Sequence, residues 1–229
     1  MAETYTEDEE LARVIQWFKK NGVALVVGVV LGLAIIGGWK WWQAHVNSQA
    51  VAAAQLYGSV AQKIASGDIS DGVLANVDAL KQNHAKSPYA ANAVFGLAAH
   101  AVGEQQYDKA LGQLDWVIDN SASVPTRNLA RVRKARVLWA TGKTDAALKL
   151  LQSKHPQSFD RLYAELTGDI YAAKGDRDKA YHAYQRAVAA ADGQQGVSIL
   201  QQKLAQTAPA DEQAVATSAA AGHSSAEGA

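Results

Sequence analysis

A run of nineteen residues without a charged side chain, residues 21–39, lies between Lys20 and Lys40 near the N-terminus. In an α-helix this run extends about 28 Å, which matches the thickness of the hydrocarbon core of a bilayer. No other stretch of the sequence combines this length with this apolar composition. The sequence therefore predicts a transmembrane helix at residues 21–42, with the long C-terminal part in water on one side.

Basic residues beside the predicted span indicate which way it crosses the membrane. Arg13, Lys19 and Lys20 precede the span, whereas Lys40 is the only Lys or Arg at its C-terminal end, and the next is Lys63. The flank that is richer in Lys and Arg usually remains in the cytoplasm. We therefore expect a cytoplasmic N-terminus and a large C-terminal domain on the opposite side.

A cleaved signal peptide is the alternative interpretation of the same run. The run is long for a signal-peptide core, and the nearest small-x-small cleavage site, residues 48–50, lies well beyond its end. It also ends in three tryptophans, Trp39, Trp41 and Trp42, which are typical of the membrane interface. These features favour a retained anchor.

Residues 1–20 are predicted to form a cytoplasmic amphipathic segment. Thr6 and Glu9 have the spacing of a capping box, which would begin a helix near Thr6. Apolar residues follow at helical spacing: Leu11, Val14, Ile15 and Phe18. This pattern is typical of a short helix on the inner membrane surface, and a hydrophilic lead-in to the span is the alternative.

Small residues recur every four positions inside the span, at Ala24, Gly28 and Gly32. This spacing places them on one face of a helix and allows a second helix to approach closely. We expect this face to contact a membrane helix of a partner.

Composition argues against several functional classes. The chain has 22 Lys plus Arg and 22 Asp plus Glu, so its net charge of zero offers no footprint for nucleic acid, and membrane lipid is expected only around the anchor. It has no cysteine, which excludes disulfides and thiolate chemistry. Its six histidines lack metal-binding spacing, and its sequence contains no phosphate-binding loop or nucleophile elbow. We therefore expect no enzyme activity, no cofactor and no metal.

A repeated pattern runs through the C-terminal part of the chain. Three segments align on a central alanine: Ala110, Ala147 and Ala180. These alanines are 37 and 33 residues apart, close to the period of helix-pair repeats. Gly142 and Gly175 stand five residues before the second and third alanines, where a tight turn between helices needs a positive φ. Gln105 occupies the corresponding place in the first unit.

Prolines separate these units, because proline ends helices and is tolerated at the start of the next one. The pattern predicts an all-α, tetratricopeptide-like domain at residues 43–206. Its expected helices are an atypical pair, three regular pairs and a short final helix: 44–66 with 72–84, 88–120, 126–154, 158–191 and 197–206. Residues 207–229 have no aromatic side chain and are rich in Ala, Ser, Gly and Glu, so we expect a disordered tail there.

The third unit is the most similar to a tetratricopeptide repeat, and three further segments are informative: Ser87-Pro-Tyr-Ala90, Leu129-Ala-Arg-Val-Arg-Lys-Ala135 and Gly168-Asp-Ile-Tyr-Ala-Ala-Lys-Gly175. In this order after a single span, they resemble the YfgM family, ancillary subunits of the bacterial Sec translocon, over residues 5–205. The resemblance implies a single-pass protein of the bacterial inner membrane with a periplasmic domain. It further implies an adaptor between the translocon and periplasmic chaperones, particularly the membrane-anchored prolyl-isomerase-like chaperone PpiD.

Two other functions remain open at this point: a helical-repeat scaffold for another cell-envelope assembly, and a regulator that acts through the cytoplasmic segment. A homo-oligomer is also open. By analogy with tetratricopeptide arrays, whose first helices line a concave groove, six residues are candidates for partner contact: Asn92, Phe95, Arg136, Trp139, Glu165 and Asp169. They depart from the Lys/Arg/Asn clamp that holds C-terminal carboxylates, and core packing is the alternative for Phe95 and Trp139.

Overall fold

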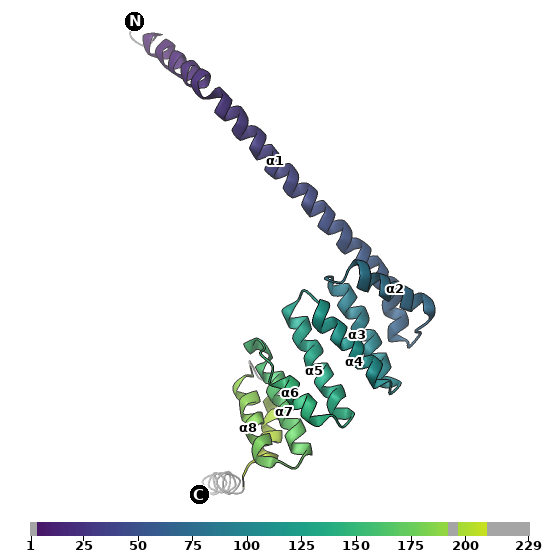
Figure 1. Cartoon of the computed structure of the whole chain (residues 1–229). Coiled ribbons are helices and arrows are strands. Elements are labelled where there is room, and N and C mark those ends of the chain that lie inside the picture. The colour runs from purple at the N-terminus through teal and green to yellow at the C-terminus, as the bar shows by residue number, and fades with distance from the viewer. Residues whose placement is uncertain (1–3, 192–196, 210–229) are drawn as a thin grey trace, which may run out of the picture. The chain divides into compact units, whose positions relative to one another are not determined.

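A computed structural model of the chain describes residues 4–191 and 197–209. Within these ranges the regular elements are all helices, as the sequence predicts (Figure 1). The chain divides into two units, Met1–Ala52 and Ala53–Ala229. The predicted tail lies outside the described residues after position 209, and Thr207 still belongs to the last helix.

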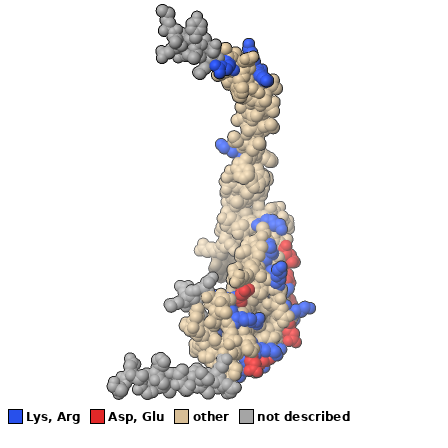
Figure 2. All heavy atoms as spheres, turned by 90° about the vertical axis from the view of Figure 1, so that its left-hand side faces the viewer, with Lys and Arg blue, Asp and Glu red and all other residues tan. Residues whose placement is uncertain are grey.

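The first unit is built from helix α1, Thr4–Ala65, whose C-terminal part belongs to the second unit. Among the described residues, α1 is the one helix that is long and apolar enough to cross a membrane, and none of its most apolar stretch is buried. Figure 2 shows a length of this helix without charged side chains on the visible face. A core helix of a soluble protein would be mostly covered, so this bare apolar surface favours contact with lipid.

Helix α1 differs from the sequence prediction in being continuous. The sequence predicts an amphipathic helix, a span from residue 21 and a new helix from residue 44, but one helix passes through all three segments. Its first residue, Thr4, precedes Thr6, so the expected helix start at Thr6 is wrong. The helix continues because this segment has no proline, and an isolated glycine in a helix costs only about 1 kcal/mol.

The described part of the second unit contains eight further α-helices and a short 3-10 helix, Gln157–Phe159. The α-helices are α2 (Asp71–Asn83), α3 (Pro88–Gly103), α4 (Tyr107–Asn120), α5 (Val124–Ala140), α6 (Thr144–Leu151), α7 (Asp160–Ala173), α8 (Arg177–Ala189) and α9 (Val197–Thr207). The three predicted pairs are therefore α3 with α4, α5 with α6 and α7 with α8. Helix α2 completes the atypical pair, and α9 is the predicted final helix.

Local sequence explains where the first helices of the pairs begin. Pro88 is the first residue of α3, and the Ser87 hydroxyl accepts a hydrogen bond from the Tyr89 N–H at 3.2 Å. At the start of α5, the Ser123 hydroxyl accepts from the Thr126 N–H at 3.3 Å. Each serine satisfies an N–H group that has no partner within the helix, which fixes the helix start.

The turns inside the three pairs share one conformation. Gly142 has a φ of 77°, Gly175 a φ of 78° and Gln105 a φ of 57°. In each turn the N–H of the following residue donates to the carbonyl five residues earlier, over 2.7–3.0 Å. This hydrogen bond is typical of helix ends at which the residue after the helix has a left-handed backbone conformation. The predicted positive φ is confirmed at both glycines, and Gln105 adopts it without being a glycine.

Small residues set the spacing between the helices of the second unit. The three central alanines are fully buried, and each helix from α3 to α9 packs against its neighbour in sequence. At Gly168 of α7, a Cβ atom would lie 2.5 Å from Cε1 of Tyr184 on α8. Glycine at this position therefore allows the close packing of the third pair. Three apolar clusters follow one another along the array.

Candidate partner groove

All six groove candidates lie on α3, α5 and α7, the first helices of the three pairs. Helix α3 contacts α5 and α5 contacts α7, so these helices lie side by side along the array (Figure 1). The structure nevertheless divides the candidates among four local environments.

The first environment is a cavity of about 330 Å³ between α3 and α5, which we call the α3–α5 cavity. Phe95 and Arg136 both line it, so the structure brings these two candidates together. Most of the remaining wall is apolar and is formed by Ala98, Ala99, Val102, Leu114 and Val137. Arg133 also lines the cavity.

Arg133 is not among the residues predicted from the sequence, although it lies three residues before Arg136 and so on the same face of α5. Its guanidinium carbon lies 4.3 Å from the ring centre of Phe95, a cation–π distance. Partial burial, and then the positive charge of Arg136, lower the pKa of Arg133. Phe95 itself is only 8 % exposed, so it belongs to the core and to the cavity wall at once.

The second environment is a cavity of about 400 Å³ between the end of α1 and α3, the α1–α3 cavity. Asn92 lines it together with Tyr57 and His100. Ala99 lines both cavities, so the two adjoin each other over α3.

Trp139 lies in a third environment. Its half-buried ring packs against the apolar cluster formed by α5, α6 and α7, and it lines neither cavity. The structure therefore separates Trp139 from Phe95 and Arg136.

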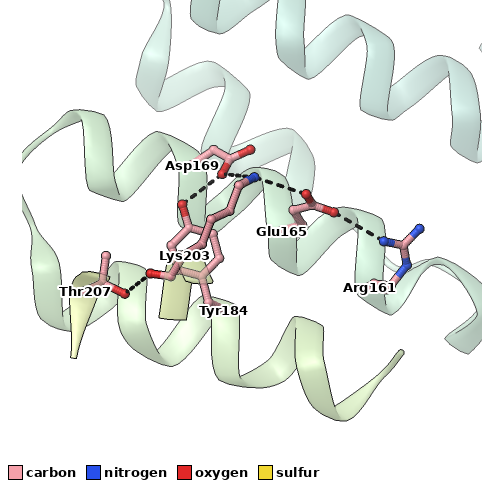
Figure 3. A network of polar contacts seen from close by, with 6 residues as sticks. All are labelled: Arg161, Glu165, Asp169, Tyr184, Lys203 and Thr207. Atoms are coloured by element: carbon pink, nitrogen blue, oxygen red, sulfur yellow. Dashed lines mark hydrogen bonds and ion pairs between the residues drawn. The ribbon is translucent and has the colours of Figure 1, made fainter. Parts of the chain in front are cut away.

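Glu165 and Asp169 form the fourth environment, where α9 meets α7 (Figure 3). The Lys203 ammonium lies 3.1 Å from Oε1 of Glu165 and 2.8 Å from Oδ1 of Asp169. The Tyr184 hydroxyl donates to the same Asp169 oxygen over 2.8 Å, and Arg161 lies 3.5 Å from Oε2 of Glu165. Both predicted groove carboxylates are thus paired within the fold.

This network shifts the protonation equilibria of its members. Burial lowers the pKa of Lys203, but the hydrogen bonds to Asp169 and Glu165 outweigh burial and raise it overall. Lys203 is not predictable from the sequence, because it lies 34 residues from Asp169 on a helix whose docking face no local pattern specifies.

No group of three His, Asp or Glu side chains among the described residues is placed to hold a metal ion. His155 lies 3.1 Å from Asp160 and stacks on Tyr163 with 3.8 Å between ring centres, which ties the loop before α7 to that helix. The groove offers two adjoining cavities with a basic rim on one of them.

Comparison with known proteins gives one consistent result. The tetratricopeptide repeat-like domain family matches residues 15–208. The ancillary SecYEG translocon subunit of Haemophilus influenzae is 29 % identical over 205 residues, which cover 90 % of this chain and 97 % of the relative. The protein of that name from Neisseria gonorrhoeae is 30 % identical over 188 residues, 82 % of this chain and 90 % of the relative. The one from Escherichia coli is 29 % identical over 182 residues, 80 % and 87 % of the two chains. No solved structure matches the chain.

Proposed function

Because the chain belongs to the YfgM family of ancillary SecYEG translocon subunits, with their tetratricopeptide repeat-like domain, we propose that it is a noncatalytic adaptor at the Sec translocon. One observation carries this proposal. The similarity runs through both the apolar helix and the repeats, over 97 % of the Haemophilus influenzae relative. Because this chain and the relative share both the anchor and the repeat domain, we infer that both act at the same membrane complex.

We propose a topology in which residues 1–20 are cytoplasmic and residues 21–42 cross the bacterial inner membrane. Residues 43–206 then form the periplasmic repeat domain, and residues 207–229 are its tail. The three basic residues before the span, against Lys40 alone at its C-terminal end, support this orientation.

Two surfaces are available for partners in this arrangement. In the membrane, Gly28 and Gly32 have open space where a Cβ atom would stand, so a translocon helix can approach them closely. In the periplasm, the α3–α5 and α1–α3 cavities lie on the face formed by first helices, where tetratricopeptide arrays hold their ligands. The family resemblance makes a periplasmic chaperone of the PpiD type the expected occupant of the repeat domain.

Affinity purification of the full chain from membranes in mild detergent tests the adaptor proposal. We expect SecY, SecE and SecG to copurify at near-stoichiometric yield. Replacement of both Gly28 and Gly32 with Leu should reduce that yield, because the larger side chains keep a partner helix away. Replacement of both Gly37 and Gly38 with Leu is the matched control, since it makes the same two changes away from the Gly28–Gly32 face of the same helix.

The alternative of a scaffold for another envelope assembly predicts a different result. A purification that yields other envelope proteins and no translocon subunit would contradict the adaptor and favour the scaffold. Deletion of residues 1–10 distinguishes the adaptor from a regulator that acts through the cytoplasmic segment. Such a regulator would lose its effect on deletion, while recovery of the translocon would stay unchanged.

A further inference from the structure

We infer that the α3–α5 cavity binds an extended segment of a partner protein in which an Asp or Glu side chain lies beside a large apolar side chain. This inference rests on the proposed adaptor function and names the chemistry that its repeat domain recognises. It is carried by the apolar wall of the cavity and by the two arginines at its rim.

The apolar part of the site is open to a side chain from outside. The cavity has a volume of about 330 Å³, and its wall includes Ala98, Val102 and Val137. Val102 is 38 % exposed, so apolar surface reaches the solvent at this point. Burial of an aromatic or aliphatic side chain here would remove apolar area from water on both partners.

The charged part of the site is set by helix α5, which carries five cationic side chains and no Asp or Glu. Three of the five have acceptors in the fold. Lys134 pairs with Asp115, Arg131 donates to the side chain of Asn128, and Arg127 donates to two backbone carbonyls.

The other two cations, Arg133 and Arg136, have no carboxylate within ion-pair distance among the described residues. Both line the α3–α5 cavity. Burial, and then the positive charge of Arg136, lower the pKa of Arg133, so the two like charges repel each other here. A carboxylate placed between them would relieve this repulsion and form charge-assisted hydrogen bonds.

The site is suited to an extended segment rather than to a small molecule. The α1–α3 cavity adjoins the α3–α5 cavity at Ala99, which is exposed. Its small side chain leaves room for a backbone to cross α3 at this point, so one segment can place side chains in both cavities.

The acidic group is assigned to a side chain of the segment and not to a free C-terminus. A terminal-carboxylate clamp sets an amide beside its cations, but Asn92 lines the α1–α3 cavity, away from Arg133 and Arg136. The acidic candidates Glu165 and Asp169 do not oppose such a ligand, because Lys203 and Arg161 balance their charges within the fold.

The test uses the purified full chain in detergent micelles and fluorescent peptides made of Gly and Ser around a central glutamate–phenylalanine pair. The peptides are acetylated and amidated, so they carry no terminal charge. We expect saturable binding to the wild-type chain. Arg136→Gln should weaken it roughly tenfold, because the change removes a charge-assisted hydrogen bond to the glutamate.

Two matched controls isolate the site. Arg186→Gln removes the same charge from an exposed position on α8 and should leave binding unchanged. A peptide with glutamine in place of glutamate should bind roughly tenfold more weakly to the wild-type chain and lose nothing further on Arg136→Gln, because the two changes remove one interaction.

Three results would overturn the inference. They are equal binding of the glutamate and glutamine peptides, equal effects of Arg136→Gln and Arg186→Gln, and binding only of a peptide that ends in phenylalanine with a free carboxylate. None of these three results contradicts the adaptor proposal, because that proposal depends on recovery of the translocon. Loss of translocon recovery with intact peptide binding would instead contradict the adaptor and leave the cavity's chemistry standing.

Discussion

At the scale of single residues, Gln105 shows that a repeat alignment can indicate backbone conformation even where the residue type differs. Alignment on the central alanines sets Gln105 where the other two units have Gly142 and Gly175, and all three have a positive φ. The turn is therefore dictated by its place in the repeat, and the residue adapts to it. A non-glycine residue in the left-handed region is strained, because its Cβ crowds the following carbonyl.

Replacement of Gln105 with Gly should consequently stabilise the second unit. We expect the free energy of unfolding to rise by about 0.5–1 kcal/mol. The relief of backbone strain raises it, and the greater conformational entropy of glycine in the unfolded chain offsets part of that gain. Denaturant unfolding followed by circular dichroism measures the change. Gln106→Gly is the control, because Gln106 has a φ of −85° and glycine there relieves no left-handed strain. If Gln105→Gly is no more stable than this control, the strain argument is wrong.

At the scale of elements, prediction succeeded where the signal is local. Pro88 and the glycines of the turns act within a few residues, so they set the helix pairs of the second unit correctly. The continuity of α1 was not predicted. Neither the amphipathic pattern nor the apolar run indicates whether the helix ends at the junction between them. The clamp of Lys203 on Glu165 and Asp169 was also missed, because it depends on how α9 docks on α7.

The docking of α9 should make the stability of the second unit sensitive to high pH. Burial, and then the hydrogen bond donated to Asp169, raise the pKa of Tyr184, and the pKa of Lys203 is also raised. Groups with a raised pKa stabilise the fold fully below their unfolded pKa, which is about 10 for tyrosine, and lose that contribution as the pH rises. We therefore expect the free energy of unfolding to fall with pH above about 10.

Tyr184→Phe should make that fall shallower, because phenylalanine has no proton to lose. Tyr107→Phe, which removes a tyrosine outside the network, should keep the wild-type slope. Denaturant midpoints measured across the alkaline range compare the three proteins. A wild-type slope in Tyr184→Phe would show that ionisation of the Tyr184 hydroxyl does not cause the loss of stability at high pH.

At the scale of the whole molecule, the sequence predicts much of the anchor and only part of the groove. The span was visible because a bilayer demands a long apolar run, and lipid contact needs no other part of the chain. The groove depends on which residues meet across helices, so Phe95 and Arg136 were placed together but Arg133 was not identified. Orientation is the remaining property of the whole chain, and it determines which compartment each surface faces.

The absence of cysteine makes orientation directly measurable. Single variants Thr6→Cys and Ser66→Cys place a thiol before and after the span, and Ser66 is exposed. Because the basic residues lie before the span, a membrane-impermeant maleimide added to spheroplasts should label Ser66→Cys and spare Thr6→Cys. Solubilisation in detergent should then allow both to react, which controls for intrinsic reactivity. Labelling of Thr6→Cys alone would invert the topology, and the repeat domain with its basic cavity would then face cytoplasmic partners.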